Sequence, residues 1–253
     1  MSRRLWPVWA AFAVLFLAYQ APEGIGMQLL GSFPVQAALL LLFFPIAWAV
    51  ARARGYRGVE AYALERRPGW LRTLGVTFAL AVVAKALAVA VGVRFGVYEV
   101  APAEAEVGSL ALGLAGVLAT TFFPSVAEDI VTRGFWFRQA PALGRGALFV
   151  VATAAIYVLN HVFRLANGPA EWAMLFAFGL AYATALVRTD TLWAAVGLHW
   201  GWNAAAFAAP DLFGVQTLRD DLSPWFSAGA HLAMLGAVLV LTPWLRTGEP
   251  QRR

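Results

Sequence analysis

Residues 73–93 read TLGVTFALAVVAKALAVAVGV; they stand between Arg72 and Arg94 and contain a single charged residue, Lys85. About 20 consecutive, mainly apolar residues are what an α-helix needs to cross the hydrocarbon layer of a bilayer. This stretch therefore predicts a transmembrane helix.

The rest of the chain repeats this pattern. Apolar stretches of roughly 16 to 25 residues alternate with short charged clusters, and only 13% of the residues are charged, against about 25% in a soluble domain. We expect one all-α transmembrane domain over residues 1–253, a polytopic bundle of about eight helices. The expected helices are 5–20, 28–51, 72–93, 107–139, 146–164, 171–188, 191–209 and 226–246. The fourth is too long for a simple span, and we expect Pro124 to bend it.

The basic residues indicate the orientation of the chain. The net charge is +5, but most arginines flank apolar segments, where they are membrane orientation signals, so we expect no nucleic-acid partner. With the N-terminus inside, 15 of the 19 Lys and Arg residues fall on the cytoplasmic side. We therefore expect both termini in the cytoplasm. The Ala-, Arg- and Gly-rich composition suggests a bacterial cytoplasmic membrane, and the absence of cysteine excludes disulfides, thiolate chemistry and Cys-ligated metals.

Three polar motifs interrupt the apolar segments between about residues 124 and 209. The first is EDIVTRG at residues 128–134. Asp129 and Arg133 are four residues apart, so they share a helix face and can form an ion pair. Glu128 is turned away by about 100° and is free for another task. The same charges could mark a solvated helix end, but three aromatic residues, 135–137, follow at once.

The second motif is YVLNH at residues 157–161, in which Tyr157 and His161 share one face. His161 could instead be an interfacial histidine bonded to a carbonyl, with Asn160 and Arg164 lining the outer rim.

The third motif is HWGWN at residues 199–203. His199 and Asn203 are one helical turn apart, and Gly201 between them permits close approach of another group. A structural hydrogen bond between helices is the alternative.

Together the three motifs offer a carboxylate, two imidazoles and an amide on three helices at compatible depths. A carboxylate in a partly dry site can act as a general base toward water. Histidines can orient the water, bind a metal or protonate the leaving amine, and Asn203 can donate to the developing oxyanion. A bundle core also supplies a shielded cavity for a hydrophobic substrate.

The ordered motifs Glu-Asp-x-x-x-Arg, aromatic-x-x-x-His and His-x-x-x-Asn resemble those of the CPBP family, which includes type II CAAX prenyl endopeptidases and bacterial Abi proteins. The family usually has Glu-Glu in its first motif and Phe in its second, so Asp129 and Tyr157 depart from the pattern. The shorter Asp129 keeps the charge and the pairing with Arg133, and we expect activity to survive.

The resemblance implies an intramembrane endopeptidase acting on a membrane-associated protein or peptide. In this interpretation Glu128 activates water with His161 beside it, while His199 and Asn203 stabilise the oxyanion. Asp129, Arg133 and Tyr157 would support the site. A non-proteolytic scaffold or immunity protein that binds a peptide in the cavity is the alternative. A transporter is less favoured, because no inverted repeat is visible.

The family is often described as metalloproteases, so Glu128, His161 and His199 could be three ligands of a zinc site with an open fourth position. No His-Glu-x-x-His signature is present, and we favour water activation without a metal. Two further ionisable residues, Lys85 and His231, lie within expected helices but outside the three motifs. We expect His231 to make a structural hydrogen bond, and Lys85 to snorkel outward or to be a counter-ion of Glu128 or Asp129. The oligomeric state and the substrate are not indicated.

Overall fold

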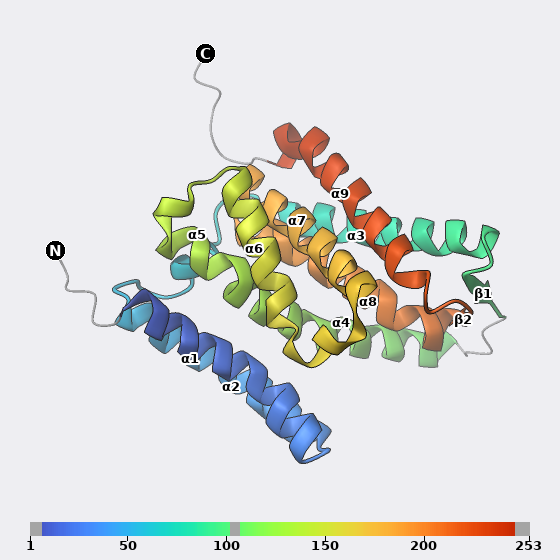
Figure 1. Cartoon of the computed structure of the whole chain (residues 1–253), viewed down its shortest axis with the longest axis horizontal. Coiled ribbons are helices and arrows are strands. Elements are labelled where there is room, and N and C mark those ends of the chain that lie inside the picture. The colour runs from blue at the N-terminus through green and yellow to red at the C-terminus, as the bar shows by residue number, and fades with distance from the viewer. Residues whose placement is uncertain (1–6, 102–106, 246–253) are drawn as a thin grey trace.

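A computed structural model describes residues 7–101 and 107–245. The described part of the chain is a bundle of nine α-helices (Figure 1) with short π and 3-10 segments and one two-stranded ribbon. This confirms the all-α, polytopic class. The elements are α1 (Val8–Ala21), η1 (Pro22–Leu29), α2 (Phe33–Ala53), η2 (Val59–Tyr62), α3 (Trp70–Arg94), β1 (Tyr98–Val100), α4 (Val107–Asp129), η3 (Ile130–Gly134), α5 (Phe135–Gln139), η4 (Pro141–Leu143), α6 (Ala147–Asn160), η5 (Val162–Asn167), α7 (Pro169–Thr189), α8 (Leu192–Phe213), β2 (Val215–Thr217) and α9 (Ser223–Leu245).

Six segments of the described chain are long and apolar enough to cross a membrane, so the protein is a multi-pass integral membrane protein. They are Val8–Leu29, Phe33–Ala53, Trp70–Arg94, Leu110–Gln139, Pro169–Thr189 and Ser223–Leu245. The other two expected crossings correspond to α6, which is apolar but only 14 residues long, and to α8, which is 22 residues long but carries His199 and Asn203.

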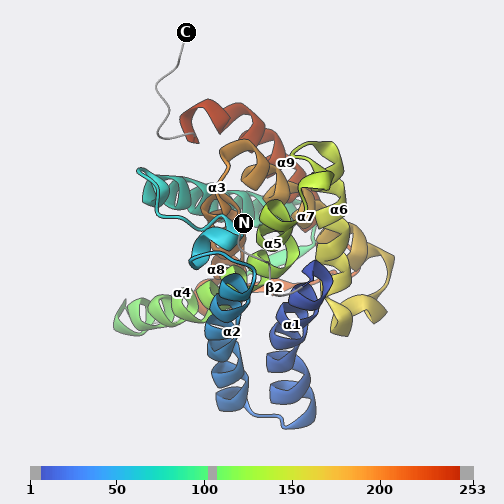
Figure 2. The ribbon, with the colours of Figure 1, turned by 90° about the vertical axis from the view of Figure 1, so that its left-hand side faces the viewer.

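Helix α7 lies at the centre of the bundle. In its most apolar window 67% of the residues are buried, against 17–33% in the other five spans. Helices α1 and α2 lie side by side as a hairpin at one edge (Figure 2), and several of their large apolar side chains are exposed, among them Trp9, Leu17, Leu41 and Trp48. Such apolar exposure is expected of helices that face lipid.

The turn between α7 and α8 is short and well specified. Asp190 ends α7 in the left-handed conformation, with φ 55°. The Thr191 side chain then accepts a hydrogen bond from the Trp193 backbone N–H, which caps the start of α8. This turn brings α8 back beside α7 and so sets the depth of His199.

Glycines bring α8 against α3. A Cβ atom on Gly197 would lie 2.0 Å from Thr77 Oγ1, and one on Gly201 would lie 2.4 Å from the Phe78 carbonyl oxygen. The expectation that Gly201 permits close approach is therefore confirmed, and the spacing of four is the small-residue pattern of tightly packed membrane helices. His199 lies between these glycines in sequence.

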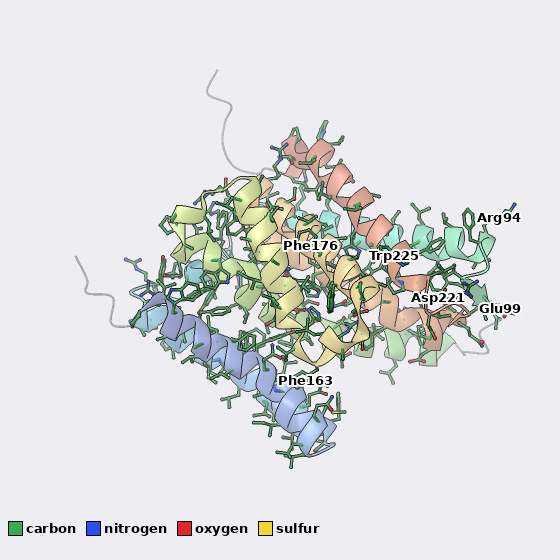
Figure 3. All side chains as sticks on the ribbon, in the orientation of Figure 1. Arg94, Glu99, Phe163, Phe176, Asp221 and Trp225 are labelled. Carbon is green, nitrogen blue, oxygen red and sulfur yellow. The ribbon has the colours of Figure 1, made fainter. Side chains whose placement is uncertain are left out.

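Three local features depart from the sequence predictions. The irregular turn of the fourth helix is the π segment Ile130–Gly134, placed after Pro124 and within the first motif. The fifth helix ends at Asn160 and not at residue 164, because His161 takes φ −85° and ψ 53° and a 3-10 segment follows. An antiparallel ribbon pairs Tyr98 with Thr217 and Val100 with Val215. Figure 3 places Arg94, Glu99 and Asp221 together at this end of the molecule.

Candidate active site

The first motif is buried where α4 passes into the π segment. Glu128 is 5% exposed, and Asp129 and Arg133 are completely buried. The Arg133 guanidinium forms an ion pair with Asp129 Oδ1, as the spacing of four predicted. Its Cζ atom also lies 4.9 Å from the ring centre of Tyr157 and 5.1 Å from that of Tyr182. Two aromatic faces and a carboxylate thus surround this buried cation.

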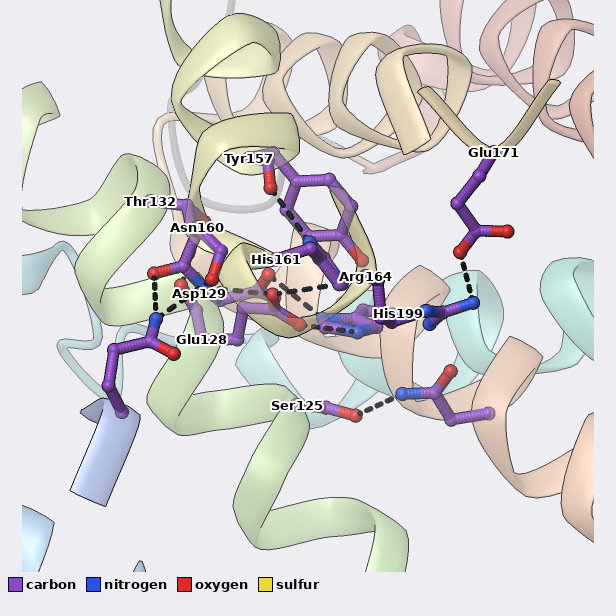
Figure 4. Close-up of polar contacts among 12 residues, drawn as sticks. Ser125, Glu128, Asp129, Thr132, Tyr157, Asn160, His161, Arg164, Glu171 and His199 are labelled. Carbon is purple, nitrogen blue, oxygen red and sulfur yellow. Dashed lines mark hydrogen bonds and ion pairs between the residues drawn. The ribbon is translucent and has the colours of Figure 1, made fainter. Parts of the chain in front are cut away.

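Both histidines of the motifs turn the same ring atom toward Glu128 (Figure 4). His161 Nε2 lies 3.4 Å from Glu128 Oε1, and His199 Nε2 lies 3.5 Å from Glu128 Oε2. The chain therefore brings together three of the four residues that sequence analysis assigned to catalysis. His199 is 2% exposed, whereas the His161 side chain keeps 13% exposure.

The opposite ring atoms fix the tautomers. His161 Nδ1 lies 2.8 Å from the Tyr157 carbonyl oxygen, and His199 Nδ1 lies 3.1 Å from Asp129 Oδ1. A carbonyl and an ionised carboxylate only accept, so each Nδ1 carries a hydrogen and donates. In the neutral rings both Nε2 atoms are then acceptors, facing a carboxylate that is also an acceptor. The arrangement suits a guest that donates hydrogen bonds, such as water.

Asn160 is a site residue that sequence analysis missed. It is 3% exposed, and its Nδ2 donates to Glu128 Oε1 at 3.0 Å. The expectation that it lines the outer rim is therefore wrong. The cause is the helical phase of α6, because Asn160 lies on the same buried face as Phe149, Thr153 and Tyr157. Arg164 lies farther along, is half-exposed and pairs with Glu171.

Asn203 is held near this cluster without touching Glu128. Its Nδ2 donates to Ser125 Oγ at 3.2 Å, and Ser125 lies about one turn before Glu128 on α4. An amide nitrogen has two hydrogens, so one remains available for a further acceptor.

Tyr157 packs edge-on against His161, with the two ring centroids 4.7 Å apart.

The sequence comparison now bears on this geometry. Residues 109–205 match the family model described as type II CAAX prenyl endopeptidase Rce1-like. Over this segment the chain is similar to the Rce1-like family, and the match covers less than half of the chain. The segment holds Glu128, His161, His199 and Asn203, together with Asn160. A search of curated proteins finds no match for the chain.

Lys85 and His231 are ionisable residues that lie in helices outside the Rce1-like segment. Lys85 Nζ lies 5.0 Å from the ring centre of Trp202 and 5.7 Å from that of Tyr98. Among the ion pairs of the described residues, none joins it to Glu128 or Asp129. His231 makes the hydrogen bonds expected of it: Nδ1 donates to the Ser227 carbonyl at 2.8 Å, and Nε2 accepts from the Tyr182 hydroxyl at 2.9 Å.

His231 acts on the Rce1-like site through Tyr182. The Tyr182 ring stacks on His199, with centroids 4.9 Å apart and planes 22° from parallel. His231 therefore holds the hydroxyl of Tyr182, whose ring stacks on the His199 ring.

The candidate site contains the types of donor atom that a zinc ion binds. A carboxylate and two imidazoles are ligands that zinc accepts. Across residues 7–101 and 107–245, however, no group of three or more His, Cys, Asp or Glu side chains is arranged to hold a metal ion. Among the described residues, the arrangement of Glu128, His161 and His199 therefore does not fit the zinc site considered from the sequence.

Proposed function

We propose that this protein is an intramembrane endopeptidase that hydrolyses a peptide bond of a membrane-associated protein or peptide. One observation carries the proposal: both oxygens of the buried Glu128 carboxylate face an imidazole Nε2, at 3.4 and 3.5 Å, and each imidazole is anchored through its other nitrogen. The match of residues 109–205 to the Rce1-like family model supports it.

In the proposed reaction a water molecule donates hydrogen bonds to Glu128 and to an imidazole Nε2. Glu128 takes one proton of the water while the water oxygen attacks the carbonyl carbon of the scissile bond. The resulting tetrahedral intermediate carries the negative charge on the former carbonyl oxygen. The proton passes from Glu128 to the leaving amine, and the C–N bond breaks. His161, the more exposed of the two histidines, is the second group that can deliver a proton.

The oxyanion needs donors, and two residues can supply them. Asn203 has an amide hydrogen beyond the one given to Ser125. His199 can donate from Nε2 if Glu128 passes it the proton taken from water, and that proton then goes to the leaving amine; the Asp129 carboxylate at Nδ1 orients the ring. Asp129 and Arg133 thus orient the site, while Glu128 performs the proton transfer.

An apolar cavity supports a hydrophobic substrate. Its volume is about 410 Å³, and its wall includes Trp9 and Phe12 of α1, Ile156 and Leu159 of α6, and Asn160. The cavity therefore ends at the residue that contacts Glu128. In the orientation predicted by the arginines, with both termini in the cytoplasm, it opens toward the bilayer from the cytoplasmic half of the bundle.

The substitution Glu128→Gln tests the proposal, because it removes the base and keeps the shape. We expect cleavage of a membrane-peptide library by reconstituted protein to fall by about 100- to 10,000-fold, with the melting temperature in detergent close to native. Glu99→Gln, the same exchange on the exposed strand β1, is the matched control and should cleave normally. Binding of peptide without cleavage by the native protein would instead identify a non-proteolytic scaffold.

A further inference from the structure

A residue of the first helix reaches the candidate site from outside the Rce1-like segment. Gln20, next to the last residue of α1, donates from Nε2 to the Asn160 carbonyl oxygen at 2.8 Å and to Asn160 Oδ1 at 3.1 Å. The two bonded residues are 140 positions apart in the sequence.

The chemistry of the partners fixes the direction of this chain of hydrogen bonds. The Glu128 carboxylate can only accept, so Asn160 must present its NH2 group to Glu128. Its Oδ1 atom then faces away from Glu128 and needs a donor, which the Gln20 NH2 group supplies. An asparagine without that donor could turn its amide over and direct Oδ1 at the carboxylate.

The second bond from Gln20 acts on the backbone. Asn160 is the last residue of α6, and the carbonyl groups at a helix end lack the partners of the helix interior. Gln20 donates to this carbonyl at the point where the chain leaves the helix and His161 begins the 3-10 segment. One side chain of α1 thus holds the end of α6 on which both Asn160 and His161 depend.

We propose that Gln20 is a positioning residue of the candidate site, which aims the Glu128 carboxylate through Asn160 and fixes the backbone that carries His161. The inference rests on the proposed peptidase function. It adds to that site a residue from a helix that the family match does not cover.

The experiment is a double-mutant cycle in reconstituted, full-length protein. Gln20→Met keeps the length of the side chain and removes its donor, and Asn160→Leu removes the intermediate amide. We expect Gln20→Met to lower kcat by roughly 10- to 100-fold with KM changed less than about twofold, because the base is misplaced while the binding cavity remains. In the Asn160→Leu background the same change should lower kcat by a smaller factor than in the native protein, because only the bond from Gln20 to the backbone carbonyl of residue 160 is left to lose.

A second variant covers the case in which Gln20→Met folds poorly. Gln20→Glu keeps the shape but offers an acceptor to Asn160 Oδ1, and it should lower kcat more than Gln20→Met does. Gln28→Met is the matched control: Gln28 is exposed on the adjacent π segment and donates only to Glu23, and its loss should leave kcat at the native value.

The outcomes separate the two ideas. A purely structural cap would lower the melting temperature of Gln20→Met and leave kcat per folded molecule unchanged, which would overturn the inference. The inference would also be overturned if the fold-loss of kcat in the Gln20→Met/Asn160→Leu double variant equalled the product of the two single losses. If the native protein cleaves no membrane peptide, the proposed function fails and the inference fails with it.

Discussion

At the scale of single residues, the buried ion pair decides how the site tolerates change. Asp129 and Arg133 are both completely buried, so removing Arg133 leaves a carboxylate without its cation. We expect Arg133→Ala to lower the free energy of unfolding by about 3–5 kcal/mol, together with membrane accumulation and activity. Thermal unfolding in detergent measures the loss.

A surface pair provides the control for this prediction. Arg145 and Asp190 also form an ion pair, but their side chains are 53% and 42% exposed. Arg145→Ala should therefore change the free energy of unfolding by at most about 1 kcal/mol. If Arg133→Ala were as stable as the native protein and lost activity as completely as Glu128→Gln, Arg133 would take part in the chemistry.

The sequence predicted the charged residues of the site better than the amides. Glu128, His161 and His199 were found because ionisable groups in apolar helices are costly and stand out. Asn160 and Gln20 were missed because an uncharged amide gives little signal alone; Asn203 was predicted because it lies one helical turn from His199. The available clue was that Asn160 directly precedes His161 in an apolar helix. No sequence pattern connects it with Gln20, 140 residues away.

At the scale of elements, the contact between α3 and α8 controls the position of His199. Gly201→Ala would place a methyl group 2.4 Å from the Phe78 carbonyl oxygen, and backbone cannot move as a flexible side chain can. We expect α8 to shift, so that both the melting temperature and kcat fall. The shift acts on His199, which lies two residues away in the sequence.

The control for this change is Gly236→Ala in α9, where an added Cβ meets nothing within 4 Å. Alanine is favoured over glycine in a helix by about 1 kcal/mol, so this variant should be as stable as the native protein or slightly more stable. A Gly201→Ala protein that matched it in stability and kcat would show that the close approach is not needed.

Element types were easier to predict than their endings. Apolar length alone indicated the helices, since crossing a bilayer requires it. The π segment at Ile130–Gly134 and the end of α6 at Asn160 depend on contacts between helices, such as the Gln20 bond to the Asn160 carbonyl. The three-residue strands β1 and β2 are too short to show an alternating pattern.

At the scale of the whole molecule, the orientation in the membrane is the open prediction. The chain contains no cysteine, so single cysteines can be introduced without background. We expect Ala142→Cys, on the exposed η4 turn between α5 and α6, to react with an impermeant maleimide only from the cytoplasmic side. Gln216→Cys, on the exposed strand β2, should react only from outside. If each cysteine reacts only from the side opposite to the expected one, the predicted orientation is reversed. If both react from the same side, the predicted number of membrane crossings between them is wrong.

The hydrogen bond between α1 and α6 also constrains the order of assembly. A ribosome adds about 5–20 residues per second, so roughly 7 to 28 seconds pass between the synthesis of Gln20 and that of Asn160, 140 residues later. During that interval the newly inserted hairpin of α1 and α2 has no α6 to bind. The candidate site cannot be completed while the ribosome is still making the middle of the chain, so the nascent protein lacks the assembled site for that time.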